Sequence, residues 1–367
     1  MEGNIGFLVG NYGRKDVSAM INVPIQEGQS AFRLAAKFTE TDGFYENTFN
    51  GKSEDIGGQE RFTVMPSFQF EQENWNVTAR GSYSRYRDDA TVLVPLNYCG
   101  EDPRVNPGSL QNDLFVRLVA TSNAPGAGPE AAYKSCAKKP SSSAFKVNQD
   151  RDLAVGSEME IWGVKIEYNY SFDDLGTLTY VAGYQDTEEH GAIDSDSGPL
   201  TILHNEEKIG HWQNSHEIRF ASEFSSNFDM VVGALWMQQE YDLRRKNFPS
   251  LDSAFSGQKN EQYAFFAHTE WHLTDKLTLI GAGRYSVDEK DFSICPSGQT
   301  GCIGNPIKDS EKWTDFSPRL GVNYQFTTTC LAMPMLPVRS ELEAIMEKQG
   351  ASRQPDPMIR KRIRPMR

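Results

Sequence analysis

The stretch KLTLIGAGRYSVD, residues 276–288, alternates apolar and polar side chains one by one. Its apolar members are Leu277, Leu279, Tyr285 and Val287, and its polar members are Lys276, Thr278, Arg284, Ser286 and Asp288. Successive side chains of a β-strand point to opposite faces, so this stretch predicts a strand with one apolar and one wet face. A helix requires apolar residues three and four positions apart, and that spacing is missing here.

The same alternation recurs along the chain up to about residue 327. It predicts about twelve strands, which begin near residues 3, 16, 31, 61, 75, 158, 176, 212, 228, 260, 276 and 312. Many of them are longer than the roughly 5–6 residues of a strand in a soluble protein. They fit instead the roughly 9–11 residues that a strand needs to cross a bilayer.

The connections between these stretches alternate between short and long. Short, turn-forming connections lie at residues 26–30, 71–74, 171–176, 223–227 and 274–275. Long polar connections lie at residues 40–60, 89–157, 189–211, 244–259 and 289–311, and the short connection 12–15 falls on their side. Aromatic residues stand beside the short turns, namely Phe70, Trp75, Phe172, Phe228 and Trp271. This arrangement is typical of an antiparallel transmembrane β-barrel with interfacial aromatic girdles.

The alternative is a large soluble all-β protein, a sandwich or a propeller, whose strands alternate as well. Such folds have shorter strands and more evenly spaced connections. The chain of 367 residues carries a formal net charge of −13 and 38% hydrophobic residues, without the run of about 18 apolar residues that a membrane helix needs. An acidic chain argues against nucleic acid as a partner, because nucleic-acid binding needs a basic surface.

Four cysteines fall in pairs within two long connections. Cys99 and Cys136 share one, and Cys295 and Cys302 share the other. Paired cysteines within loops predict disulfides in an oxidising compartment, with reduced thiols as the alternative. Their spacing does not match a zinc site.

Several short motifs appear in a fixed order. They are Gly10-Asn11-Tyr12-Gly13-Arg14, Ile21-Asn22-Val23-Pro24-Ile25, Phe32-Arg33-Leu34-Ala35, Asp42-Gly43-Phe44-Tyr45-Glu46-Asn47, Ser215-His216-Glu217-Ile218-Arg219-Phe220 and Phe316-Ser317-Pro318-Arg319-Leu320-Gly321-Val322. Taken together, they resemble the barrel of TonB-dependent outer-membrane receptors over roughly residues 2–327. The resemblance implies a partial barrel, the first twelve or so of 22 strands.

This resemblance implies a receptor for active uptake of a scarce nutrient such as a ferric siderophore. Family members use a plug domain and an N-terminal box that contacts the TonB complex, and neither is seen in this chain. The expected partners are outer-membrane lipid and the small-molecule ligand. The expected location is the bacterial outer membrane, although the sequence begins Met1-Glu2, without the basic start and the apolar segment of a signal peptide. We expect a fragment that does not transport by itself, with no cofactor and no catalytic residue.

The composition changes at about residue 328. All aromatic residues lie before this point, and residues 328–367 carry eight basic and four acidic side chains. We therefore divide the chain into a barrel portion, 1–327, and a basic tail, 328–367, that lacks the family pattern. Residues 340–349 predict one short helix, since Ser340 is a candidate N-cap with Glu343 three positions later, and disorder is expected beyond it.

Two groups of side chains on the polar face are candidate sites. A basic set, expected to face the lumen, is a candidate for guiding an anionic complex or for pairing with plug carboxylates: Arg33, Lys37, Arg80, Arg219, Arg284 and Arg319. The alternative is ordinary lumen polarity, matched by Glu167, Glu217 and Asp315. The second group, His268, Glu270 and His272, is a weak metal candidate, because only neighbours two apart on one strand can reach one ion.

No nucleotide loop or nucleophile motif is present, so the sequence does not favour an enzyme. Two rival functions stay open at this point. One is a passive porin-like channel or surface-binding barrel without energy coupling. The other is a soluble carbohydrate-active β-protein.

Overall fold

A computed structural model describes residues 1–89, 145–147, 149, 156–194, 204–222, 226–248, 253–296, 305–327, 330–332 and 335–337. One large antiparallel sheet contains twelve long strands in sequence order. They are β1 (Glu2–Val9), β2 (Lys15–Gln26), β3 (Ser30–Thr41), β6 (Gln59–Glu71), β7 (Trp75–Asp88), β9 (Gly156–Ser171), β10 (Gly176–Asp194), β11 (His204–Ser222), β12 (Phe228–Phe248), β13 (Ser253–Thr274), β14 (Leu277–Cys295) and β15 (Ile307–Thr327). Within the described residues, no helix is long and apolar enough to cross a membrane.

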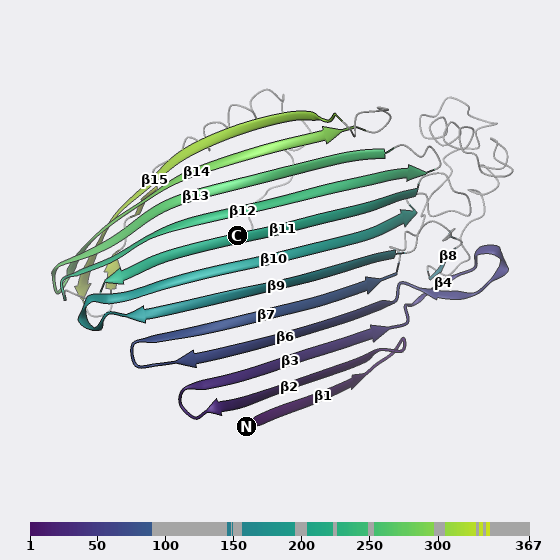
Figure 1. The fold of residues 1–367 in the computed structure, drawn as a ribbon, viewed down its shortest axis with the longest axis horizontal. Coiled ribbons are helices and arrows are strands. Elements are labelled where there is room, and N and C mark those ends of the chain that lie inside the picture. Colours follow the sequence, from purple (N-terminus) through teal and green to yellow (C-terminus); the bar gives the residue numbers. More distant parts are fainter. Residues whose placement is uncertain are drawn as a thin grey trace, which may run out of the picture.

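The twelve predicted strands are confirmed. The alternation of their connections is less sharp than predicted, because most of the stretch 244–259 is strand and only residues 249–252 connect β12 and β13. In Figure 1 the short turns lie at one end of the sheet and the longer connections at the other. The twelve long strands pair antiparallel in sequence order, so each connection returns the chain to the neighbouring strand of the sheet. The β1–β2 connection, residues 10–14, is also short, although it lies at the end of the longer ones. Tyr12 and Gly13 both have positive φ and form the corner of a tight turn, in which the Arg14 N–H donates to the Asn11 carbonyl.

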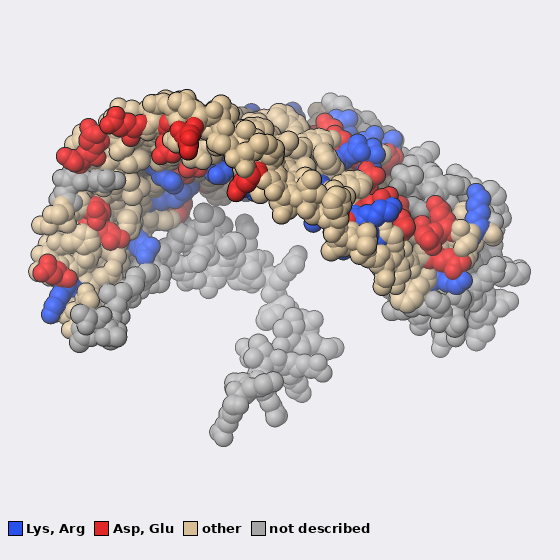
Figure 2. All heavy atoms as spheres, turned by 90° about the horizontal axis from the view of Figure 1, so that it is seen from below, with Lys and Arg blue, Asp and Glu red and all other residues tan. Residues whose placement is uncertain are grey.

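The register assigns every strand residue to one of two faces. We call the face that carries Arg33, Arg80 and Arg284 the inner face, and the opposite one the outer face. The inner face holds the closely packed residues Ala264 and Ile280, which are 0% and 7% exposed. Figure 2 shows the sheet curved into an arch, with Lys and Arg side chains visible in its hollow.

The outer face is apolar and open. Its exposed side chains include Trp162, Val164, Ile166, Phe265, Phe316, Leu320 and Phe326. Phe265 is 62% exposed and Leu320 is 67% exposed, values that would be costly in water over so continuous a surface. An exposed apolar band backed by a polar face is the pattern of a sheet that faces lipid on one side.

Aromatic rings border this band at both ends. At the short-turn end, Phe70 stacks on Trp75 with 5.2 Å between ring centroids, and Phe228 pairs with Trp271 across β12 and β13. The long-connection end has a second border, which the sequence pattern did not reveal. There the Tyr83 hydroxyl donates to Glu160 at 3.2 Å, and the Trp236 indole donates to Glu261 at 3.1 Å. Rings with an apolar body and a polar tip that points away from the band are characteristic of a membrane interface.

The strands differ from the predicted ones mainly in length. β1 has 8 residues, whereas β10 to β15 have 19 to 22 residues each, so polar stretches expected to be loops are paired strands. Residues 189–194 pair with 204–209, and residues 289–294 pair with 307–312. Above the membrane band both faces are wet, so side chains there need not alternate, and the sequence carries no period-2 signal to mark these strands.

A second, small sheet lies at the long-connection end. It consists of β4 (Tyr45–Asn47), β5 (Glu54–Ile56) and β8 (Lys146–Val147), with a single 3-10 turn, η1 (Phe49–Gly51), between the first two. Ile56 is fully buried and Val147 is 3% exposed. Phe145 packs near Phe44 and Tyr45, with ring centroids 6.2 Å and 6.0 Å apart. This small core ties the connection after β3 to the connection before β9.

The region after β15 was expected to contain no further strand. Two three-residue strands, β16 (Cys330–Ala332) and β17 (Met335–Pro337), pair with β15. The predicted helix at 340–349 lies outside the described residues. So do Cys99, Cys136 and Cys302, which leaves both proposed disulfides as predictions, while Cys295 is buried at the end of β14.

Candidate ligand-binding site

All six predicted basic residues lie on the inner face, and the register brings two of them into one lateral row. Arg33 is opposite Ser67, Ser67 is opposite Arg80, and Arg80 is opposite Lys165. We call Arg33, Arg80 and Lys165 the basic row. With strands about 4.8 Å apart, the row spans about 14 Å. Its third member, Lys165, was not among the predicted site residues.

The other predicted residues lie elsewhere on the same face. Lys37 is four residues from Arg33 on β3, toward the long connections. Arg219, Arg284 and Arg319 lie toward the short turns, where Arg219 is opposite Gly233 and Arg284 is opposite Ser317. The six predicted basic residues therefore share one face of the sheet but do not form one cluster.

Ion pairing divides these cations into two kinds. Arg219 contacts Glu217 at 3.3 Å, and Lys165 contacts Glu167 at 3.3 Å, as expected for ordinary lumen polarity. Among the described residues, no carboxylate lies within ion-pair distance of Arg33, Lys37 or Arg80, and these three side chains are exposed. A guanidinium without a carboxylate partner is available to a planar anionic group, to which it can donate two parallel hydrogen bonds.

His268, Glu270 and His272 do not converge on one point. His268 contacts Glu270 at 3.1 Å, whereas His272 contacts Asp229 at 2.7 Å and Thr278 at 2.9 Å through its two ring nitrogens. Within the part of the chain that is described, no three His, Cys, Asp or Glu side chains are placed to hold a metal ion. His272 alone links β12, β13 and β14 near the short turns, whereas the contact of His268 stays within β13.

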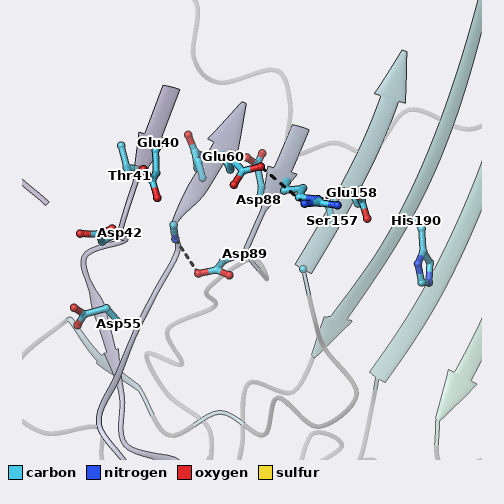
Figure 3. A pocket seen from close by; sticks show the side chains of 14 residues that line it. Glu40, Thr41, Asp42, Asp55, Glu60, Asp88, Asp89, Ser157, Glu158 and His190 are labelled. Atoms are coloured by element: carbon cyan, nitrogen blue, oxygen red, sulfur yellow. Dashed lines mark hydrogen bonds and ion pairs between the residues drawn. The ribbon is translucent and has the colours of Figure 1, made fainter. Parts of the chain in front are cut away.

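A pocket of about 600 Å³ lies at the long-connection ends of β3, β6, β7, β9 and β10. We call it the rim pocket (Figure 3). It is lined by Glu40, Thr41, Asp42, Asp55, Gly58, Gln59, Glu60, Arg87, Asp88, Asp89, Gly156, Ser157, Glu158 and His190. It lies about eight residues along β7 from Arg80, or about 27 Å.

Carboxylates dominate the rim pocket, but most of them are engaged. Glu60 pairs with Arg85 at 3.4 Å, Glu158 with Arg87 at 2.7 Å, and Asp88 with Arg61 at 2.9 Å. Asp89 accepts a hydrogen bond from the backbone N–H of Gly58 at 3.0 Å, which joins the start of β6 to the end of β7. Glu40 pairs with Lys15 at 3.3 Å. The pocket is thus a set of cross-strand ion pairs that brace the rim, with Asp42 and Asp55 as its remaining acidic groups.

The small sheet stands beside this pocket, since Asp42 and Asp55 belong to the same connection as β4 and β5. An ion pair between Glu46 of β4 and Lys146 of β8 also holds the small sheet together. The Lys146 ammonium contacts Glu46 at 2.6 Å, and the Ser53 hydroxyl donates to the same carboxylate at 2.9 Å. The hydrogen bond from Lys146, followed by that from Ser53, lowers the pKa of Glu46.

Comparison with known proteins agrees with this architecture. The family model described as TonB dependent receptor-like, beta-barrel, matches residues 102–330. This match covers more than half of the chain, which therefore belongs to the TonB-dependent receptor β-barrel family. Comparison of the sequence with characterised proteins gives no significant match.

Solved structures of siderophore receptors share the fold. The ferric yersiniabactin uptake receptor FyuA from Yersinia pestis superimposes with a TM-score of 0.62 at 17% identity, over 89% of this chain and 45% of that one. The ferric-catecholate import receptor Fiu from E. coli K12, in its open form, gives 0.58 at 13% identity, over 87% and 51%. The siderophore receptor PiuA from Acinetobacter baumannii gives 0.59 at 12% identity, over 89% and 47%.

The chain thus spans about half the length of these receptors. At such low identity the likeness concerns the fold, that is, a contiguous part of a transmembrane barrel wall. These neighbours are named as uptake, import or siderophore receptors, and the ligands in their names belong to those proteins.

Proposed function

We propose that this chain is part of the wall of an outer-membrane receptor that takes up a scarce nutrient such as a ferric siderophore. The observation that carries the proposal is the basic row on the inner face, in which the Arg33 and Arg80 side chains are exposed. In a complete barrel this hollow is the lumen through which the ligand passes. Two guanidinium groups about 10 Å apart suit an anionic complex with carboxylate or catecholate oxygens.

Charge placement supports an order of events. The rim pocket holds more acidic than basic groups, so an anionic ligand gains little there. Deeper on the inner face, the basic row offers the opposite potential, and partial exclusion of water strengthens it. We infer that the row retains the ligand, and that transport of the retained ligand depends on a plug domain and its contact with the TonB complex.

The test is isothermal titration calorimetry on the full chain in zwitterionic detergent. It measures the binding of an anionic ferric complex and of a neutral ferric complex of similar size. We expect selective binding of the anionic complex, weakened by salt because of screening. Arg33→Ala with Arg80→Ala should reduce the affinity at least about tenfold, the loss of one or two charge-assisted hydrogen bonds.

Arg244→Ala is the matched control, since Arg244 lies on the outer face and is 73% exposed. Equal binding of charged and neutral complexes, or no response to the double substitution, would contradict the proposal. Ligand-independent conductance in planar bilayers would favour the porin-like alternative instead.

A further inference from the structure

The open edge of β15 is partly covered by the two short strands that follow it. After β15 the chain reverses direction, so that β16 pairs with the end of β15 and β17 pairs with a stretch nearer its middle. Ala332 of β16 is opposite Tyr324, and Leu336 of β17 is opposite Leu320, so the two pairings share one register. β16 and β17 are therefore two pieces of one antiparallel strand along this edge. We call them together the edge strap.

The edge strap lies along the lipid-facing part of β15. There the outer-face side chains are apolar or aromatic and exposed, namely Leu320, Val322, Tyr324 and Phe326. Beyond Phe316, toward the long connections, the outer face of β15 becomes polar, with Lys308, Ser310, Lys312 and Thr314. Water hydrogen-bonds the backbone of an open strand edge at this polar level, but not in the hydrocarbon of a bilayer. The strap thus supplies backbone pairing at the depth where water does not.

The direction of the backbone groups of β15 follows from one hydrogen bond. The N–H of Gln325 donates to the Lys276 carbonyl at 2.9 Å, on the side of β14. Successive residues of an antiparallel strand point their N–H and C=O groups to opposite sides, so Leu320 and Tyr324 point theirs toward the open edge. The strap residues opposite them point their own N–H groups back toward β15.

The prolines of this region agree with the arrangement. Pro337 is opposite Arg319, whose backbone groups point toward β14, so the missing N–H of Pro337 costs no bond to β15. The interruption between β16 and β17 contains Pro334, which has no N–H to donate. Pro318 lies at an edge-facing position of β15, and the pairing with the strap ends at Arg319, directly next to it. The strap therefore ends where β15 itself stops offering donors.

We propose that the edge strap closes the lipid-facing edge of β15 and thereby denies this edge to a strand from a second copy of the chain. The proposal concerns backbone pairing alone and does not depend on which nutrient is taken up. An open strand edge accepts an added antiparallel strand, because each new hydrogen bond satisfies two backbone groups.

The opposite edge of the sheet offers such a strand. Among the described residues, β1 pairs with β2 alone, and it runs opposite to β15 because the twelve long strands alternate in direction. The outer-face residues of β1 are apolar and exposed, namely Ile5, Phe7 and Val9. Two copies with the same orientation in a bilayer can therefore join β1 to β15 with their apolar faces aligned. The strap competes with this contact, because both use the same backbone groups of β15.

The test measures two properties of the full chain in lauryldimethylamine oxide. Light scattering gives the molar mass over a range of protein concentrations, and hydrogen exchange by mass spectrometry reports on peptides covering residues 319–326. The variant Ala332→Pro with Leu336→Pro removes the two strap N–H groups that face β15. The matched control is Leu331→Pro with Met335→Pro, because these residues are opposite Gln325 and Gly321 and their N–H groups face away from β15.

We expect the native chain and the control to be monomeric, with slow exchange in residues 319–326. In the Ala332→Pro, Leu336→Pro variant this exchange should accelerate at least about tenfold at low protein concentration. As the concentration rises, the variant should dimerise with a dissociation constant at least about tenfold lower than that of the native chain. Peptides from β11, in the middle of the sheet, should exchange equally in all three proteins and show that the sheet is retained.

Equal exchange of residues 319–326 in the native chain and the variant overturns the proposal. A variant that stays monomeric at all concentrations also overturns it, including the case in which β15 closes on β1 of its own chain. Dimerisation of the native chain or of the control to the same extent as the variant does so as well. Binding of ferric complexes is measured independently, so none of these outcomes bears on the proposed uptake function.

Discussion

Asn47 and Gln149 hydrogen-bond to each other twice across 102 residues of sequence. The Asn47 side-chain Nδ2 donates to the Gln149 carbonyl at 3.0 Å, and its Oδ1 accepts from the Gln149 N–H at 3.0 Å. Asn47 is 3% exposed and Gln149 is fully buried. One amide side chain therefore replaces a backbone partner and extends the pairing of β4 and β8 beyond its last strand residue.

Replacement of Asn47 by alanine is expected to release the segment 145–149 from the small sheet. The Gln149 N–H and carbonyl would both lose their partner in a buried place, at a cost of about 1–3 kcal/mol in local opening free energy. Hydrogen exchange measured by mass spectrometry on peptides covering 145–149 should accelerate accordingly. Thr48→Ala, which removes a single bond to the Val147 carbonyl, is the milder control. Unchanged exchange in Asn47→Ala would refute the prediction.

Gly13 and Gly28 provide a matched pair of turn glycines. Both have positive φ, 62° and 71°, where side chains other than glycine are strained. A Cβ on Gly13 would lie 1.8 Å from the Asp42 Oδ2, whereas a Cβ on Gly28 would meet nothing within 4 Å. Gly28→Ala should cost about 1 kcal/mol from the backbone alone, and Gly13→Ala somewhat more, because the Asp42 carboxylate must turn away from the new methyl group. Urea midpoints of the folded chain in detergent compare them, and equal midpoints would contradict a clash between the new methyl group and Asp42.

The Glu46–Lys146 contact predicts a pH dependence at the long-connection end. The folded structure lowers the pKa of Glu46, so the contact stabilises the small sheet above the ordinary glutamate pKa of about 4.3. This contribution is lost as the pH falls through the lowered value. Exchange protection of residues 45–56 should therefore decline below about pH 4.3 in the native chain. In Glu46→Gln the decline should be smaller, while Glu27→Gln, in a turn at the opposite end, should behave as the native chain does.

A lysine on the two faces of β13 should have opposite consequences. Phe265 points outward at 62% exposure, and His268 points inward beside Glu270. Phe265→Lys places a charge in the lipid-facing band, at a cost of about 2–4 kcal/mol near the bilayer midplane. His268→Lys places an ammonium group near Glu270 on the polar inner face and should be tolerated. The fraction recovered in liposomes after refolding, measured by protease protection, distinguishes the two; similar recovery would contradict the assigned faces.

Most of the large sheet was predictable because one physical rule governs it. Wherever one face meets lipid and the other water, as around Phe265 and His268, the alternation must be strict, and the sequence shows it. The strand ends beyond the aromatic border were not predictable. Residues 204–211, for example, have water on both faces, and their pairing with 187–194 leaves no periodic signal.

For the candidate site, the sequence predicts on which face each residue lies, but not which residues are neighbours on that face. Alternation places Arg33 and Arg80 on the inner face, yet their common row depends on the register across β6. Lys165 joins them only because the long connection before β9 returns in one particular register. The small sheet was missed for a related reason: β4, β5 and β8 have two or three residues each, too few for a pattern to be read.

The polar extensions of β10 to β15 have a consequence for how such a chain can vary over evolutionary time. Within the membrane band, insertion of one residue would turn every following side chain to the wrong face, so changes of length there must come in twos. Above the band both faces accept polar residues, and a single insertion or deletion reverses faces at little cost. Divergence in length among related receptors is therefore free to accumulate in the upper hairpins, while the lipid-facing segment keeps its count of residues.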